Sequence, residues 1–345
     1  MRDSNHTFII HIYAIIAMRG KKNMKKLILL TIPALLIAGC ANKQQQPVQE
    51  EDYKLNLSIA APSGAPSVCL YKYLSNESKV EIRSPEEASG IAAYMATNQK
   101  DIIILPTNAG VQQIAKNNAN YKIAANITFG NLFIGATGHD DDGVMNGDDY
   151  VVLIQQNNVP DKLFQYCYGD LNLTNTHYLN LASNMKNVLA TGKNPEDENA
   201  DVDYVLIAEP AFTAAKSQNA NATQYASLQE VYKTKSGNKE ITQASIFVSN
   251  TANQEEVNKF LAALEKDIND FVNNPSVIDE YVKDFDNVQF AAKFGVGNAQ
   301  LLKNLTTNGN RMGVGYKNAK ENKANIDQFL TMWPAIGTTS EEIYY

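Results

Sequence analysis

The chain has 345 residues, 44% of them hydrophobic, and a formal net charge of −7. This length is enough for two lobes with cores of their own, whereas the acidic balance disfavours nucleic acid, which binds to basic patches. Three cysteines are too few for a disulfide framework.

The first part of the chain has the pattern of a bacterial export signal. Met24–Cys40 begins with a basic segment, continues as an apolar run and ends with small residues before Cys40. This ending resembles the signal of lipoproteins, in which the cysteine is diacylated and becomes the new N-terminus. The alternative is a transmembrane anchor, but the run Leu27–Gly39 is shorter than the ~20 apolar residues that span a bilayer.

We therefore expect residues 1–39 to be a signal peptide with an upstream extension and 40–53 to be a lipidated tether. Translation from Met18 or Met24 would give a conventional signal. The mature protein is then expected on the extracytoplasmic face of the cell membrane, held by its lipid anchor. Without residues 1–39, 24 Lys and Arg remain against 36 Asp and Glu, so the mature chain is more acidic still.

The stretch Asp101–Gly138 has the pattern of a strand, a turn, a helix and a second strand. Four consecutive branched apolar residues at 102–105 indicate a strand that is buried on both faces. Pro106 is expected to end this strand, and Thr107 or Asn108 can cap the helix that follows. Open α/β sheets bind ligands at such junctions, where a helix begins at the carboxyl end of a parallel strand.

Tyr121–Gly138 is too long for one ordinary strand, so we interpret it as a strand that leaves one lobe and enters another. Before the central stretch, Lys54–Pro62 and Val80–Ser84 are expected to be strands. Helices are expected after them, at Val68–Leu74 and at residues 85–98. This alternation of strands and helices predicts a parallel sheet with right-handed crossovers.

The arrangement around Pro106 is repeated later in the chain. Tyr150–Ile154 is an apolar strand, and the polar residues 155–158 precede another helix start. Two such strand ends facing each other would form a cleft, with Asn108 on one wall and Asn157 on the other. The acidic loop 139–149 lacks the alternating ligands and terminal glutamate of a helix-loop-helix calcium site, so a solvated connection is expected.

The last part of the chain is mostly helical in pattern. Strands are expected at Thr176–Leu181, Val202–Ile207 and Ala244–Val248, and Gln254–Phe271 carries the apolar face of a core helix. Glu209 follows one of these strands. It is either a ligand carboxylate or an acid that caps the next helix.

The order of these motifs resembles that of the solute-binding lipoproteins of ABC importers, in the group that includes thiamine-precursor, nitrate and sulfonate binders. The resemblance covers Lys54 to about Trp333 and rests on SGAP at 63–66, LPTNAG at 105–110, ANITFGNLFIG at 125–135, and NMKNVLATGKN at 184–194 before DYVLIAEP at 203–210. It implies the α/β type II periplasmic-binding-protein fold, whose two lobes are mostly parallel sheets flanked by helices.

The resemblance also implies how the chain is divided and where it binds. Lobe 1 would be formed by 54–126 and 211–345, lobe 2 by 130–208, and two crossovers near Asn126–Gly130 and Ala208–Pro210 would act as a hinge that lets the lobes close on a ligand. The residues that the resemblance places in the pocket are Ser63, Gly64, Thr107, Asn108, Ala109, Thr128, Asn131, Gln155, Asn157 and Glu209.

The expected partners are a small-molecule ligand, an ABC permease and an ATPase, with the protein itself a monomer that needs no metal or cofactor. A thiamine precursor, nitrate, a sulfonate and another small heterocycle all remain open as ligands. No cluster of arginines marks a multiply charged anion. Helix N-termini could hold a single anionic group or a polar heterocycle.

Two other classes of function were weighed against solute binding. A surface lipoprotein acting as an adhesin or sensor would be expected to show repeats, and the sequence has none. An enzyme related to thiamine-pyrimidine synthesis would use histidine and cysteine, but neither His139 nor His177 lies near a cysteine in sequence. We therefore expect no enzyme, and expect Cys69 and Cys167 to be buried free thiols.

Overall fold

The computed structural model describes residues 53–345 apart from 85–86, 88, 118 and 141. The expected signal peptide, the expected lipid site Cys40 and nearly all of the tether therefore lie outside the described residues, as does the expected helix start at 85–86. Within the described part of the chain, no helix combines the length and the apolar character needed to cross a membrane.

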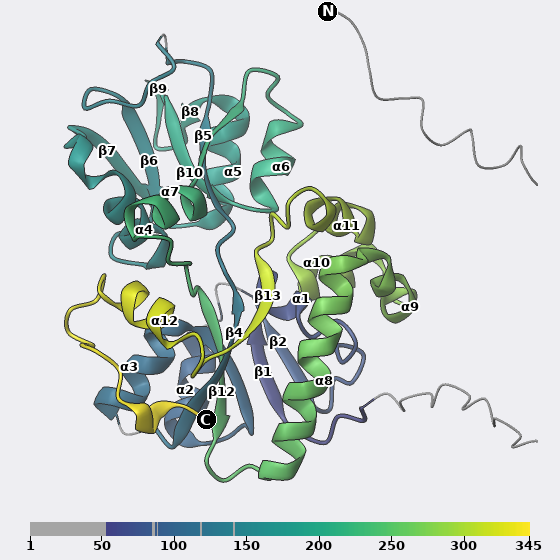
Figure 1. Ribbon diagram of the computed structural model, residues 1–345. Helices are drawn as coiled ribbons and strands as arrows, with labels where there is room; N and C mark the ends of the chain where they lie inside the picture. The colour runs from purple at the N-terminus through teal and green to yellow at the C-terminus, as the bar shows by residue number, and fades with distance from the viewer. Residues whose placement is uncertain (1–52, 85–86, 88, 118, 141) are drawn as a thin grey trace, which may run out of the picture. The chain divides into compact units, whose positions relative to one another are not determined.

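The first sheet has six strands in the order β13-β4-β12-β3-β1-β2 (Figure 1). β1, β2 and β3 are parallel, as the sequence predicts, but β12 and β13 pair antiparallel with their neighbours, so the sheet is mixed rather than mostly parallel. Its strands are β1 Ile59–Pro62, β2 Val80–Arg83, β3 Ile102–Pro106, β4 Tyr121–Thr128, β12 Ala244–Ser249 and β13 Val314–Asn318.

The second sheet has five strands in the order β11-β5-β10-β6-β7. It is also mixed, because β6 is parallel to β10 and β7 whereas β5 is antiparallel to β10 and β11. Its strands are β5 Leu132–Ala136, β6 Tyr150–Ile154, β7 Asn175–Leu179, β10 Tyr204–Ala208 and β11 Thr223–Ser227, and a separate hairpin is formed by β8 Lys193–Asn194 and β9 Asp197–Asp201.

Helices cover both faces of each sheet (Figure 1). α1 and α8 to α11 pack on one face of the first sheet, and α2, α3 and α12 pack on the other. α5 and α6 cover one face of the second sheet, and α4 and α7 cover the opposite face. The α-helices are α1 Ala65–Val68, α2 Ser89–Thr97, α3 Thr107–Asn117, α4 Val159–Tyr168, α5 Ala182–Thr191, α6 Ala211–Lys216, α7 Leu228–Lys235, α8 Gln254–Asn273, α9 Ile278–Val282, α10 Asn287–Phe294, α11 Ala299–Thr307 and α12 Lys323–Leu330; the 3-10 turns are η2 Gly169–Leu171, η3 Pro275–Val277 and η4 Glu341–Ile343.

The central strand β3 contributes to two cores at once. Ile102 and Ile104 pack in the cluster beneath α8, and Ile103 and Leu105 pack in the cluster beneath α2 and α3. All four side chains are buried because successive residues of a strand point to opposite faces. The prediction of a strand buried on both faces is therefore confirmed.

The chain returns to the first sheet later than residue 211, where the sequence predicted the return. β11 pairs with β5, and α7 packs on α4 and β5, so 211–235 lie with the second sheet and not with the first. The expected assignment of 211–345 to lobe 1 is corrected for these residues. The two crossovers are residues 129–131, between β4 and β5, and residues 236–243, between α7 and β12.

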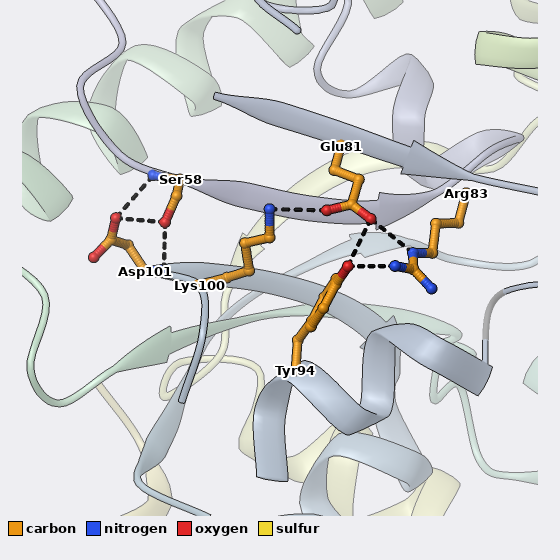
Figure 2. Close-up of polar contacts among 6 residues, drawn as sticks. All are labelled: Ser58, Glu81, Arg83, Tyr94, Lys100 and Asp101. Atoms are coloured by element: carbon orange, nitrogen blue, oxygen red, sulfur yellow. Dashed lines mark hydrogen bonds and ion pairs between the residues drawn. The ribbon is translucent and has the colours of Figure 1, made fainter. Parts of the chain in front are cut away.

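Polar contacts fix the strands at one side of the first sheet (Figure 2). The backbone N–H and the hydroxyl of Ser58 donate to the carboxylate of Asp101 at 2.8 and 2.7 Å, and Asp101 N–H donates back to the Ser58 hydroxyl at 3.0 Å. These reciprocal bonds join the entries of β1 and β3 in one register.

Beside them, Glu81 on the edge strand β2 accepts from three side chains. Arg83 Nε lies 2.8 Å, Lys100 Nζ 2.9 Å and Tyr94 Oη 2.9 Å from its carboxylate oxygens (Figure 2). Partial burial acts to raise the pKa of Glu81, but the hydrogen bonds from Lys100, Arg83 and Tyr94 outweigh it and lower this pKa to about 2.

The substitution Glu81→Gln tests this cluster. Because the pKa of Glu81 is lower in the folded state, its carboxylate stabilises the fold above the unfolded-state pKa of about 4.3, and this contribution is lost as the pH falls towards about 2. The side chain is 32% exposed, so after discounting for solvent screening we expect a loss of about 1 kcal/mol in the free energy of unfolding at pH 7.

Urea unfolding of the variant and the wild type should show this difference shrinking as the pH is lowered through that window. Glu280→Gln, at an exposed position in α9, is the matched control and should change little at any pH. A Glu81→Gln difference that stays constant into the acid would contradict the assignment.

Candidate functional site

The predicted residues of the first sheet lie at the carboxyl ends of two adjacent strands. Ser63 and Gly64 follow β1, Thr107 to Ala109 begin α3 directly after β3, and β1 and β3 pair in parallel. Gly64 has a φ of 101°, which glycine adopts without the strain that a side chain would cause. The structure therefore brings these five residues to one edge of the sheet.

Within this group, Thr107 and Asn108 differ in what their side chains do. The hydroxyl of Thr107 is buried and lies 2.6 Å from the hydroxyl of Ser245 on β12, so it is used inside the sheet. Asn108 Oδ1 is buried without a hydrogen-bond partner. A buried unpaired acceptor is costly, and Asn108 consequently has unused bonding capacity at this edge.

The predicted residues of the crossover 129–131 are tied to both sheets. Thr128 is the last residue of β4, and its carbonyl accepts from Gln243 N–H at 2.9 Å. Asn131 donates through Nδ2 to the carbonyl of Glu209 at 3.1 Å, and its Oδ1 accepts from Gln243 Nε2 at 3.4 Å. Gln243 belongs to the second crossover, so the two crossovers are joined by a chain of amides.

The predicted residues of the second sheet lie at the end of β6. Gln155 and Asn157 are exposed and have φ angles of 37° and 66°. Gln155 donates to the carbonyl of Asn180 at 2.9 Å. The cap of α4 is Asn158, whose side chain accepts from Asp161 N–H at 3.0 Å, so Asn157 does not cap this helix. Its side chain remains at the surface, and a ligand role for it stays a prediction.

Glu209 follows β10, the strand parallel to β6, and its role is decided by its contacts. Its carboxylate is buried and accepts from Thr213 N–H and Oγ1, at 3.1 and 2.9 Å, in the first turn of α6. Arg311 Nε lies 2.5 Å away. Its oxygens are thus engaged by donors of the first turn of α6 and by Arg311, as expected of an acid at a helix start, and a ligand role for Glu209 stays a prediction.

Arg311 is the main residue that the sequence analysis missed. It lies between α11 and β13, yet it reaches the second sheet, where Nη1 donates to Gln224 on β11 at 2.6 Å. Its guanidinium stacks between two rings, 4.1 Å from the centroid of Phe133 and 5.2 Å from that of Phe212. The sequence does distinguish Arg311, because Arg83 and Arg311 are the only two arginines after residue 52.

A hollow of about 400 Å³ lies beside the first crossover and is partly lined by Arg311. Phe129 and Gly130 of the crossover, Gln229 and Lys233 of α7, and the turn before β13 form its walls. None of the ten predicted site residues lines it. It is a concave surface at the junction of the two sheets.

The cysteines and histidines that the enzyme hypothesis requires are not paired with each other. Cys69 and Cys167 are free and buried, as predicted. Burial raises the pKa of the Cys167 thiol to about 12 and raises that of Cys69 further, which disfavours the thiolate needed for nucleophilic attack. His139 and His177 instead pair with surface carboxylates, those of Asp201 and Glu196.

Two carboxylates of the acidic loop 139–149 accept from backbone N–H groups of the same loop. Asp142 accepts from Val144 N–H at 2.7 Å, and Asp149 accepts from Asn146 N–H at 2.6 Å. In the part of the chain that the structure describes, no group of three or more histidine, cysteine or acidic side chains is arranged to hold a metal.

Substitution of Arg311 by leucine should test the importance of its pair with Glu209. Removing the arginine leaves a buried carboxylate without its charge partner, which costs about 3–5 kcal/mol of the free energy of unfolding. Arg83→Leu is the matched control, since the Arg83 pair with Glu81 is on a partly exposed sheet edge, where solvent screening should make the loss much smaller.

The double variant Arg311→Leu with Glu209→Gln should recover part of the loss, because no buried charge then remains. Chemical denaturation of all four proteins gives the comparison. Equal losses for Arg311→Leu and Arg83→Leu would contradict the special role of the Arg311 pair.

No protein-family model and no curated protein matches the sequence. Solved structures do match in fold. An ABC transporter from Parabacteroides distasonis has 17% identity and a TM-score of 0.63, with 84% of this chain and 98% of that one covered. The periplasmic aliphatic sulphonate binding protein SsuA from Escherichia coli has 12% identity and a TM-score of 0.57, with 80% and 86% covered.

The alkanesulfonate-binding protein SsuA from Xanthomonas axonopodis pv. citri, solved bound to MOPS, gives a similar result. It has 11% identity and a TM-score of 0.56, with 84% of this chain and 97% of that one covered. At such identities the likeness establishes the fold alone. The chain has the two-lobed α/β fold of the periplasmic binding proteins of ABC importers.

Proposed function

We propose that this protein is the solute-binding subunit of an ABC importer. It captures a small polar molecule between its two lobes and delivers it to the permease, while a lipid on Cys40 holds it at the extracytoplasmic face of the membrane. Lobe 1 comprises residues 54–128 and 244–345, and lobe 2 comprises 132–235. The crossovers 129–131 and 236–243 form the hinge.

The observation that carries this proposal is the extent of the likeness in fold. The match covers 98% of the P. distasonis protein and 97% of the MOPS-bound protein, so this chain has counterparts for nearly the whole of both structures. Polar residues at the ends of β3 and β6 further support binding between the sheets. The buried, high-pKa thiols argue against a cysteine-dependent enzyme.

The proposal is tested by transport with the intact lipoprotein. When the protein is added to vesicles that contain its permease and ATPase, ATP hydrolysis should increase only if a ligand of the protein is present. In cells, Cys40→Ala should release the protein from the membrane fraction and lower ligand uptake, because lipid chains provide the anchoring.

Asn42→Ala, which changes the tether but keeps Cys40, is the control and should leave both membrane association and uptake intact. Membrane retention of Cys40→Ala would refute the lipid anchor alone. A protein that binds its ligand but never stimulates the ATPase would refute importer function and favour a sensor or adhesin lipoprotein.

A further inference from the structure

The chain of amides that joins the two crossovers has a fixed direction. Asn131 Nδ2 donates to the carbonyl of Glu209, and because a carbonyl only accepts, the amide of Asn131 can lie only this way round. Asn131 Oδ1 must then accept, so Gln243 must present its Nε2 to it. The oxygen Gln243 Oε1 is therefore the free end of this chain, and it is buried without a partner.

This free end lies next to the predicted ligand residues of the first sheet. The backbone carbonyl of Gln243 accepts from Thr107 N–H at 3.0 Å, which places Gln243 beside the start of α3. Asn108, the next residue along, also has a buried oxygen without a partner. Thr242 Oγ1, adjacent in sequence, is buried and unpaired too. Gln243 and Asn108 thus each have a buried side-chain oxygen without a partner near the start of α3.

The two arginines, whose side chains would recognise an oxyanion, are occupied elsewhere. Both arginines of the described chain are paired with carboxylates, Arg83 with Glu81 and Arg311 with Glu209. The first amide of α3, Thr107 N–H, already donates to Gln243. Among the side chains at this edge, the unused bonding capacity is that of hydrogen-bond acceptors, the oxygens of Gln243 and Asn108.

From these contacts we infer that the ligand presents hydrogen-bond donors to this edge: it is a molecule with N–H or O–H groups, such as a carboxamide, an amine or an aminated heterocycle. This rests on the proposed function, since it assigns a ligand class to the same cleft. The donors of the ligand complete the bonding of Gln243 and Asn108. Both oxygens are shielded from water, so the ligand reaches them only when the two sheets separate.

The inference is tested by calorimetric titration with pairs of compounds that share a skeleton but differ in donors. Suitable pairs are nicotinamide and nicotinate, propanesulfonamide and propanesulfonate, and 4-aminopyrimidine and pyrimidine. The member that donates should bind at least about tenfold more tightly, which is the usual effect of leaving buried polar groups unpaired. An acceptor-only member that binds as tightly as its partner, or more tightly, overturns the inference.

Two variants test whether Gln243 causes the preference for ligands that donate hydrogen bonds. Gln243→Leu should remove most of the donor preference, whereas Gln218→Leu, the same change at an exposed position after α6, should leave it unchanged. If Gln243→Leu lowers the melting temperature strongly, Asn108→Leu provides the second test at the same edge. An unchanged preference in both folded variants also overturns the inference.

These results are separable from the proposed function. Tight binding of propanesulfonate would refute the donor ligand but leave solute binding standing. Tight binding of a donor that never supports uptake would leave the ligand class standing and refute the importer role.

Discussion

The carboxylate of Glu209 is buried where the two sheets meet, and it is stable there because Arg311 and Thr213 surround it. A buried charge without a partner would destabilise the fold by several kcal/mol. Arg311 comes from the segment before β13 of the first sheet, and Glu209 follows β10 of the second. This ion pair therefore constrains how the segments at the junction can be arranged, and the amide chain from Glu209 through Asn131 to Gln243 begins at the same residue.

Some polar groups at the junction of the two sheets have hydrogen-bond or ion-pair partners, and others have none. The ion pair and the rings of Phe133 and Phe212 hold Arg311 in one position. The neighbouring oxygens of Gln243 and Asn108 lack partners, and burying each of them costs about 1–3 kcal/mol. A closed arrangement without ligand is thus disfavoured relative to one in which ligand donors complete these bonds. In the proposed function, this difference is the free energy with which a ligand would shift the lobes towards closure.

Much of the fold was predictable because its strongest elements carry local signals. The apolar run 102–105 fits only a strand buried on both faces, and the strand Tyr150–Ile154 has the predicted bounds. The strand break within Tyr121–Gly138 is confirmed, since β4 ends at Thr128 and β5 begins at Leu132. In each case the pattern of side chains along a short stretch determines the element.

The missed features depend on contacts between distant parts of the chain. β11 has the partly exposed, polar sequence TQYAS and exists because it pairs with β5, so the return of the chain was placed too early. Glu209 and Arg311 are 102 residues apart, and Asn131 and Gln243 are 112 apart. Of the predicted site, Asn108 begins α3 and Asn131 joins the two crossovers, and the ligand roles of both, like that of Asn157, remain predictions. No periodicity reveals such pairs.

In the proposed function the two lobes close around a ligand, and this closure can be followed by measuring a distance between labels on the two lobes. Nitroxide labels at Gln112→Cys in α3 and Gln165→Cys in α4 occupy exposed positions, one on each lobe. The native Cys69 and Cys167 are buried and should not react. Pulsed electron spin resonance should show the distance between the labels becoming shorter and its distribution narrower when a bound ligand is added. The same distribution with and without a saturating ligand would contradict the account.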